Sequence, residues 1–77
     1  RLELGKLYAR QGKEKEAEKL YKECMELDSK NVHARLELGK LYAKQGNKSR
    51  ETSNYKKAAK LGNKEAQQWM VKNGMAW

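Results

Sequence analysis

Hydrophobic residues recur along this chain at the three- and four-residue spacing of a helix face. In the first segment Leu4, Leu7 and Tyr8 fall on one side of a helix, which is the side expected to face the core. A second helical pattern begins after Gly12, a residue type that suits the left-handed end of a helix. Its apolar stripe comprises Ala17, Leu20, Tyr21, Cys24 and Met25. The two stripes together predict a helical hairpin.

The opening segment occurs twice. Residues 1–12 read RLELGKLYARQG and residues 35–46 read RLELGKLYAKQG, so only Arg10 and Lys44 differ between them. The period is therefore 34 residues. Periods of this length indicate a solenoid, in which each unit buries a face against its neighbour. The pattern predicts helices near residues 1–11, 14–27, 31–45, 48–61 and 64–73.

The repeated residues also form a family motif. Leu4, Gly5 and Tyr8 give L-G-x-x-Y, and Ala17 and Tyr21 give A-x-x-x-Y. This pattern, at this period, resembles the tetratricopeptide repeat (TPR). The corresponding residues of the second copy are Leu38, Gly39, Tyr42, Tyr55 and Ala58. The resemblance covers roughly residues 1–63 and implies an all-α, right-handed superhelix that contains two helical hairpins.

Glu51 departs from this motif. It falls 34 residues after Ala17, at a position where a small apolar residue should pack. A buried, unpaired charge would be costly there. Either the second hairpin is shifted locally, or its outer helix is frayed at the start. Residues 47–54 are therefore expected to be the weakest part of the fold.

The C-terminal segment predicts a further helix. Ala66, Trp69 and Met70 share one helical face, and the pattern ends at Gly74. The segment is similar to the Sel-type relatives of these repeats, and a solenoid needs a helix that caps its last hairpin. We therefore expect a single domain with three parts: a first repeat at about residues 1–31, a second at about 32–63, and a capping helix with a tail at 64–77.

Composition narrows the class of partner. The net charge is +8, and residues 39–77 carry nine Lys or Arg against two Asp or Glu, compared with nine against eight in residues 1–38. This excess favours an acidic partner. No apolar run is long enough to span a bilayer, so no membrane partner is expected. Cys24 is the only cysteine, which fits a reducing compartment, and we expect a cytoplasmic location.

Residues that could support catalysis are few. Cys24 lies on the packed stripe, and one cysteine and one histidine cannot supply a zinc site. The six glycines form no phosphate-binding loop, and the acidic residues of the second helix alternate with lysines. His33 is most simply a surface residue at a helix start. We therefore expect neither enzyme activity nor a cofactor.

One side of the first helix in each repeat remains unexplained by this core. It carries Leu2 in the first repeat and Leu36 in the second, roughly opposite the core face. Two interpretations are open: this side packs against a neighbouring repeat, or it forms a groove. The TPR resemblance implies that inner helices line a concave face that holds a partner peptide. The candidate groove residues are Leu2, Lys6, Ala9, Arg10, His33, Leu36, Lys40, Ala43 and Lys44.

Such a groove would be basic with apolar patches, which suits a peptide segment carrying Asp, Glu or a C-terminal carboxylate. The sequence therefore predicts a non-catalytic protein–protein interaction module. Two alternatives remain. The chain begins within an apolar-periodic segment and without Met, as a piece of a longer protein or an engineered repeat would. Its first helix would then leave Leu2, Leu7 and part of Tyr8 as apolar surface, and the chain could self-associate through open solenoid ends. It could also bind nucleic acid or an anionic surface through Lys48, Arg50, Lys56, Lys57, Lys60 and Lys64.

Overall fold

The computed structural model describes residues 2–28 and 30–77. These residues contain no strand and form five helices: α1 (Leu2–Arg10), α2 (Glu14–Leu27), α3 (Val32–Lys44), α4 (Lys48–Lys60) and α5 (Lys64–Lys72). The prediction of an all-α fold is confirmed. Each helix lies where its hydrophobic period predicts it, although residue 1, the expected start of the first helix, is outside the described residues.

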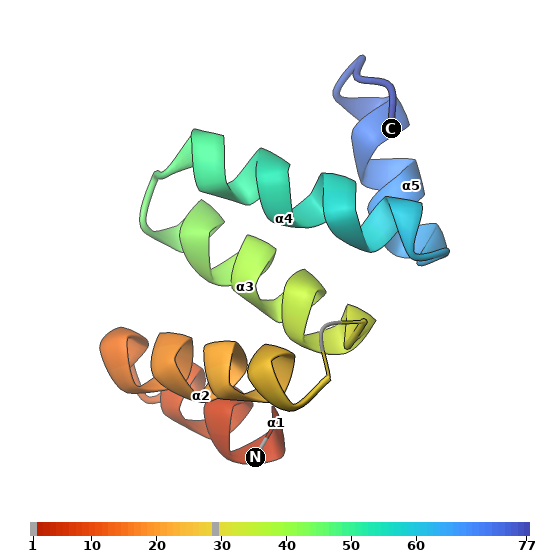
Figure 1. The fold of residues 1–77 in the computed structure, drawn as a ribbon. Helices are drawn as coiled ribbons and strands as arrows, with labels where there is room; N and C mark the ends of the chain where they lie inside the picture. The colour runs from red at the N-terminus through yellow and green to blue at the C-terminus, as the bar shows by residue number, and fades with distance from the viewer. Residues whose placement is uncertain (1, 29) are drawn as a thin grey trace.

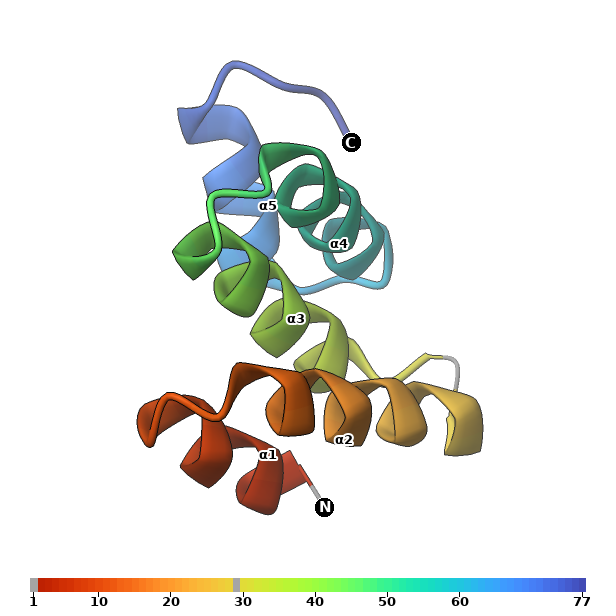
Figure 2. The ribbon, with the colours of Figure 1, turned by 90° about the vertical axis from the view of Figure 1, so that its left-hand side faces the viewer.

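The helices stack in the order of the chain (Figure 1). α1 packs against α2, α2 against α3, α3 against α4 and α4 against α5, and α1 also contacts α3. The side view in Figure 2 shows α3 between the first helical pair and the last two helices. Each hairpin therefore packs on its neighbour in the chain, which is the arrangement that the TPR resemblance implies.

Short polar residues and glycine define the helix ends. The side chains of Asn31, Asn47 and Asn63 accept hydrogen bonds at 3.0, 3.1 and 2.7 Å from the backbone N–H three residues later, where α3, α4 and α5 begin. Gly12 and Gly46 follow α1 and α3 with φ angles of 80° and 73°. These left-handed angles favour glycine and let the chain reverse into the next helix.

Glycine also brings the two helices of each hairpin together. A Cβ on Gly5 would lie 2.7 Å from Cε1 of Tyr21, and one on Gly39 would lie 3.0 Å from the ring of Tyr55. Both distances are too short for an ordinary side-chain contact. Because the two pairs are separated by the same 34 residues, the second hairpin keeps the register of the first. The predicted local shift of the second hairpin is therefore wrong.

Glu51 is accommodated without disrupting α4. It lies in the first turn of α4, where a negative charge interacts favourably with the helix dipole. It is only partly buried, whereas Ala17 is fully buried. The reason is that the α4 residues packed with α5 are Tyr55, Ala58 and Ala59, which lie further along the helix than Glu51. Since α4 is helical from Lys48 onward, the predicted fraying is also wrong. That residues 47–54 are the weakest part of the fold stays a prediction.

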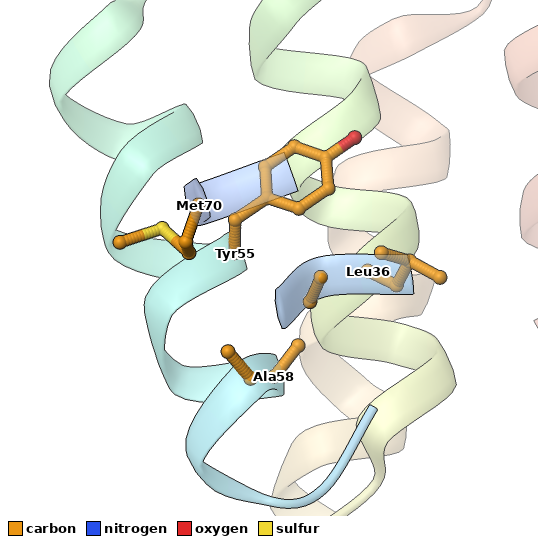
Figure 3. Close-up of a cluster of buried hydrophobic side chains, with 6 residues drawn as sticks. Leu36, Tyr55, Ala58 and Met70 are labelled. Carbon is orange, nitrogen blue, oxygen red and sulfur yellow. The ribbon is translucent and has the colours of Figure 1, made fainter. Parts of the chain in front are cut away.

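Two apolar clusters hold the stack together, and α3 contributes to both. The cluster between α2 and α3 contains Ala17, Tyr21, Leu38, Leu41 and Tyr42. The cluster among α3, α4 and α5 contains Leu36, Tyr55, Ala58, Ala59, Ala66 and Met70 (Figure 3). Trp69 stacks on Tyr55 with ring centroids 4.2 Å apart and planes 8° from parallel. α5 thus covers the second hairpin.

The outer face of α1 differs from the sequence prediction. Leu4 and Leu7 are 41% and 42% exposed. The exposure of Leu7 agrees with the apolar surface expected at the open first helix, whereas the expected core position of Leu4 is wrong. Leu38 and Leu41, which occupy the same positions in α3, are only 1% and 2% exposed. The difference is physical, because α2 covers this face of α3 while no described helix covers it on α1.

Candidate functional site

The molecule is hollowed between α1 and α3. The concavity has a volume of about 260 Å³. Four cationic side chains, one carboxylate and three less polar residues line it, and we call it the α1–α3 groove: Lys6, Ala9 and Arg10 from α1, Tyr21 from α2, and Glu37, Lys40, Leu41 and Lys44 from α3.

Helix geometry explains how these residues reach one surface. Residues 37, 40, 41 and 44 follow the three- and four-residue spacing of a single stripe along α3. Residues 6, 9 and 10 form the matching stripe on α1. Since the two helices have the same sequence here, Lys6 faces the groove in one repeat as Lys40 does in the next.

Two of the lysines already have carboxylate partners. The Nζ atom of Lys40 is 3.3 Å from a carboxylate oxygen of Glu65 and 3.9 Å from one of Glu37. The Nζ atom of Lys6 is 3.7 Å from Glu3, whose side chain is largely exposed. Exposed pairs of this kind contribute about 0–1 kcal/mol, so an incoming carboxylate could replace them at little cost.

Arg10 and Lys44 differ from these lysines, because neither makes an ion pair with any residue in the described part of the chain. They occupy the last turns of α1 and α3 and differ in position by one repeat. The uncompensated positive charge of the groove is therefore concentrated at the end where these two side chains lie.

Tyr21 adds a neutral hydrogen-bond donor to this charged surface. Its side chain is only 1% exposed, and burial, with a further contribution from Glu37, raises the pKa of its hydroxyl to about 12. The hydroxyl therefore stays protonated at neutral pH. No hydrogen bond joins it to another described residue.

The structure brings together Lys6, Ala9, Arg10, Lys40 and Lys44 from the predicted site. His33 and Ala43 are exposed on α3 but do not line the groove. The pattern missed Tyr21, Glu37 and Leu41. The spacing of residues 37, 40, 41 and 44 is the signal that identifies Glu37 and Leu41, whereas the apolar pattern places Tyr21 wholly in the core.

The structure corrects the predicted positions of two leucines in the groove. Leu36 is 5% exposed and packs among side chains of α4 and α5, so its place in an open groove is wrong (Figure 3). Leu2 is partly buried against the cluster between α2 and α3 and does not line the groove. Of the two interpretations for this face, neighbour packing explains these leucines.

Other kinds of site find little support in the described residues. Across residues 2–28 and 30–77, no group of three His, Cys, Asp or Glu side chains is placed to hold a metal ion. Cys24 is a buried free thiol. In the same residues, no helix combines the length and apolar character needed to cross a bilayer.

The fold and the groove define an α-helical repeat protein built from stacked hairpins. A family model described as TPR repeat matches residues 3–46, which is more than half of the chain. The chain belongs to the tetratricopeptide repeat family. Repeats of this family generally mediate protein–protein interactions and are typically non-catalytic. No curated protein matches the chain.

Proposed function

We propose that the chain is an interaction module that holds an acidic peptide segment of a partner protein in the α1–α3 groove. The observation that carries this proposal is the gathering of four cationic side chains and one carboxylate around a single concavity. Ion pairs and charge-assisted hydrogen bonds to carboxylates are the strongest interactions that such a surface can make.

Each part of the groove has a distinct role in this proposal. Arg10 offers a planar guanidinium that can bind a carboxylate through two hydrogen bonds, and Lys44 supplies a mobile second charge. The Tyr21 hydroxyl donates a further hydrogen bond. Ala9, which is partly exposed, gives the peptide backbone an apolar surface to lie on. The apolar contacts persist when salt screens the charges.

Reversing one groove charge tests the proposal. In Lys44→Glu, a carboxylate replaces an unpaired cation, so an acidic peptide should bind about tenfold to a hundredfold more weakly, the equivalent of about 1.5–3 kcal/mol for a charge-assisted contact. Calorimetric titration of a poly-Glu peptide measures this change. The matched control is Lys56→Glu, which makes the same charge change at an exposed position outside the groove.

Equal weakening by both variants would contradict the groove and indicate a response to net charge alone. A short oligonucleotide provides the test of the nucleic-acid alternative. If it binds more tightly than the peptide, with an affinity that falls steeply as salt rises, and if it perturbs α4 rather than the groove, the basic second half is the functional surface.

A second candidate function is self-association through α1. The exposed Leu4 and Leu7 occupy the positions that α2 buries on α3, so a second copy could cover them. We expect the sedimentation coefficient to rise with concentration, and Leu7→Lys to abolish the rise. Leu27→Lys is the control, since Leu27 is 74% exposed at the end of α2. A chain that stays monomeric at all concentrations would exclude this candidate.

A further inference from the structure

A second basic surface lies away from the α1–α3 groove, where α3 begins and α4 ends (Figure 1). Three cationic side chains and one leucine line a concavity of about 240 Å³ there: Arg35 from α3, Lys57 and Lys60 from α4, and Leu61 at the end of α4. No acidic side chain contributes to its lining. We call it the α3–α4 pocket.

The cations of this pocket lack partners among the described residues. No ion pair joins a described carboxylate to Arg35, Lys57 or Lys60. The Nε atom of Arg35 is buried and has no hydrogen-bond partner. A buried donor without a partner and three like charges around one concavity both destabilise the empty pocket. An anion bound there would relieve the repulsion between the three charges.

The first repeat lacks this cluster of cationic side chains, so the cluster is specific to the second repeat. The residues 34 positions before Lys57 and Lys60 are Glu23 and Glu26. The second repeat therefore carries two positive charges where the first carries two negative ones. The lysines are not required to end the helix, because α2 is complete through Leu27 without a basic residue in its last turn.

We propose that the α3–α4 pocket binds a phosphate-class oxyanion. The guanidinium of Arg35 would donate hydrogen bonds to it, and the ammonium groups of Lys57 and Lys60 would contact its remaining oxygens. A doubly charged tetrahedral anion matches three converging cations better than a single carboxylate does. This site is separate from the α1–α3 groove, because the two share no lining residue.

Arg35 also provides the direct measurement. Its side-chain Nε–H signal in a ¹H–¹⁵N spectrum should shift and saturate as inorganic phosphate is added, because the guanidinium gains an acceptor. Sodium chloride at the same ionic strength should leave the signal in place. Lys57→Glu, which restores the residue type of the first repeat, should weaken phosphate binding by about tenfold or more. Lys56→Glu should change it by less than about twofold, since exposed charges outside the pocket are screened.

Three results would overturn the site. These are an equal response to chloride, a phosphate response spread over all the lysines of α4, and equal losses in Lys57→Glu and Lys56→Glu. Phosphoserine and a dinucleotide, titrated in parallel, distinguish the source of the phosphoryl group. Tighter binding of phosphoserine than of inorganic phosphate indicates a modified protein partner, and tighter binding of the dinucleotide indicates a nucleotide.

Discussion

Gly39→Leu is expected to lower the melting temperature of the chain by roughly 5–20 °C. A Cβ at residue 39 would already lie 3.0 Å from the ring of Tyr55, so a leucine forces α3 and α4 apart. Overpacking of this kind costs about 1–3 kcal/mol. Helix propensity alone predicts the opposite sign, since leucine is more favourable than glycine within a helix by roughly 0.8 kcal/mol. A lower melting temperature would therefore show that the close contact outweighs helix propensity, and a higher one would show the opposite.

The control for this substitution is on the same helix. Ala43→Leu adds a similar side chain at an exposed position of α3 and should leave the melting temperature nearly unchanged. Thermal unfolding followed by circular dichroism measures both variants. A Gly39→Leu protein as stable as the parent would show that α3 and α4 do not pack as closely as the structure has them.

Tyr55→Ala should have the larger effect. The ring contacts Gly39, stacks on Trp69 and belongs to the cluster that joins three helices. Replacement of a large buried aromatic residue by alanine costs about 3–5 kcal/mol. A chain of this length has a total stability of the order of 4–12 kcal/mol. We therefore expect the variant to be largely unfolded well below the melting temperature of the parent, with the fluorescence of Trp69 shifted towards that of exposed tryptophan.

Two further variants isolate the contribution of the ring. Tyr55→Phe keeps the ring and removes only a hydroxyl for which the described residues provide no hydrogen-bond partner, so its stability should stay close to the parental value. Adding Gly39→Leu to Tyr55→Ala should recover part of the lost stability, because the leucine enters the space that the ring leaves. If the two substitutions are simply additive, residues 39 and 55 are not in contact.

The helices could be predicted from the sequence because their causes are local. The apolar spacing, the asparagines at helix starts and the glycines at helix ends all act within a few residues of where they occur. The 34-residue period then predicts the pairing of helices, since Gly5 and Gly39 must meet equivalent tyrosines. The exposure of individual leucines is harder to predict from the sequence. Leu4 and Leu38 have identical local sequences, but only Leu38 has a helix packed against it.

The α1–α3 groove shows the same limit of prediction from local sequence. Its cations could be predicted, since Lys6 and Lys40 lie on the side of each helix that the core does not use. Leu36 could not be separated from them, because helical geometry places it on that side without showing that α5 would cover it. Glu51 escapes burial for a related reason, because α5 packs on Tyr55, Ala58 and Ala59 of α4 rather than on its first turn. Both errors concern contacts made by residues more than ten positions away in the chain.

The central position of α3 bears on how the molecule folds. α3 supplies Leu38 and Leu41 to one apolar cluster and Leu36 to the other, so the first hairpin without α3 would leave Ala17 and Tyr21 uncovered. A break between residues 31 and 32 would therefore divide the repeats but also remove half of a core. We infer that the two repeats unfold in one cooperative transition, and that the repeating unit of the sequence is smaller than the unit of folding.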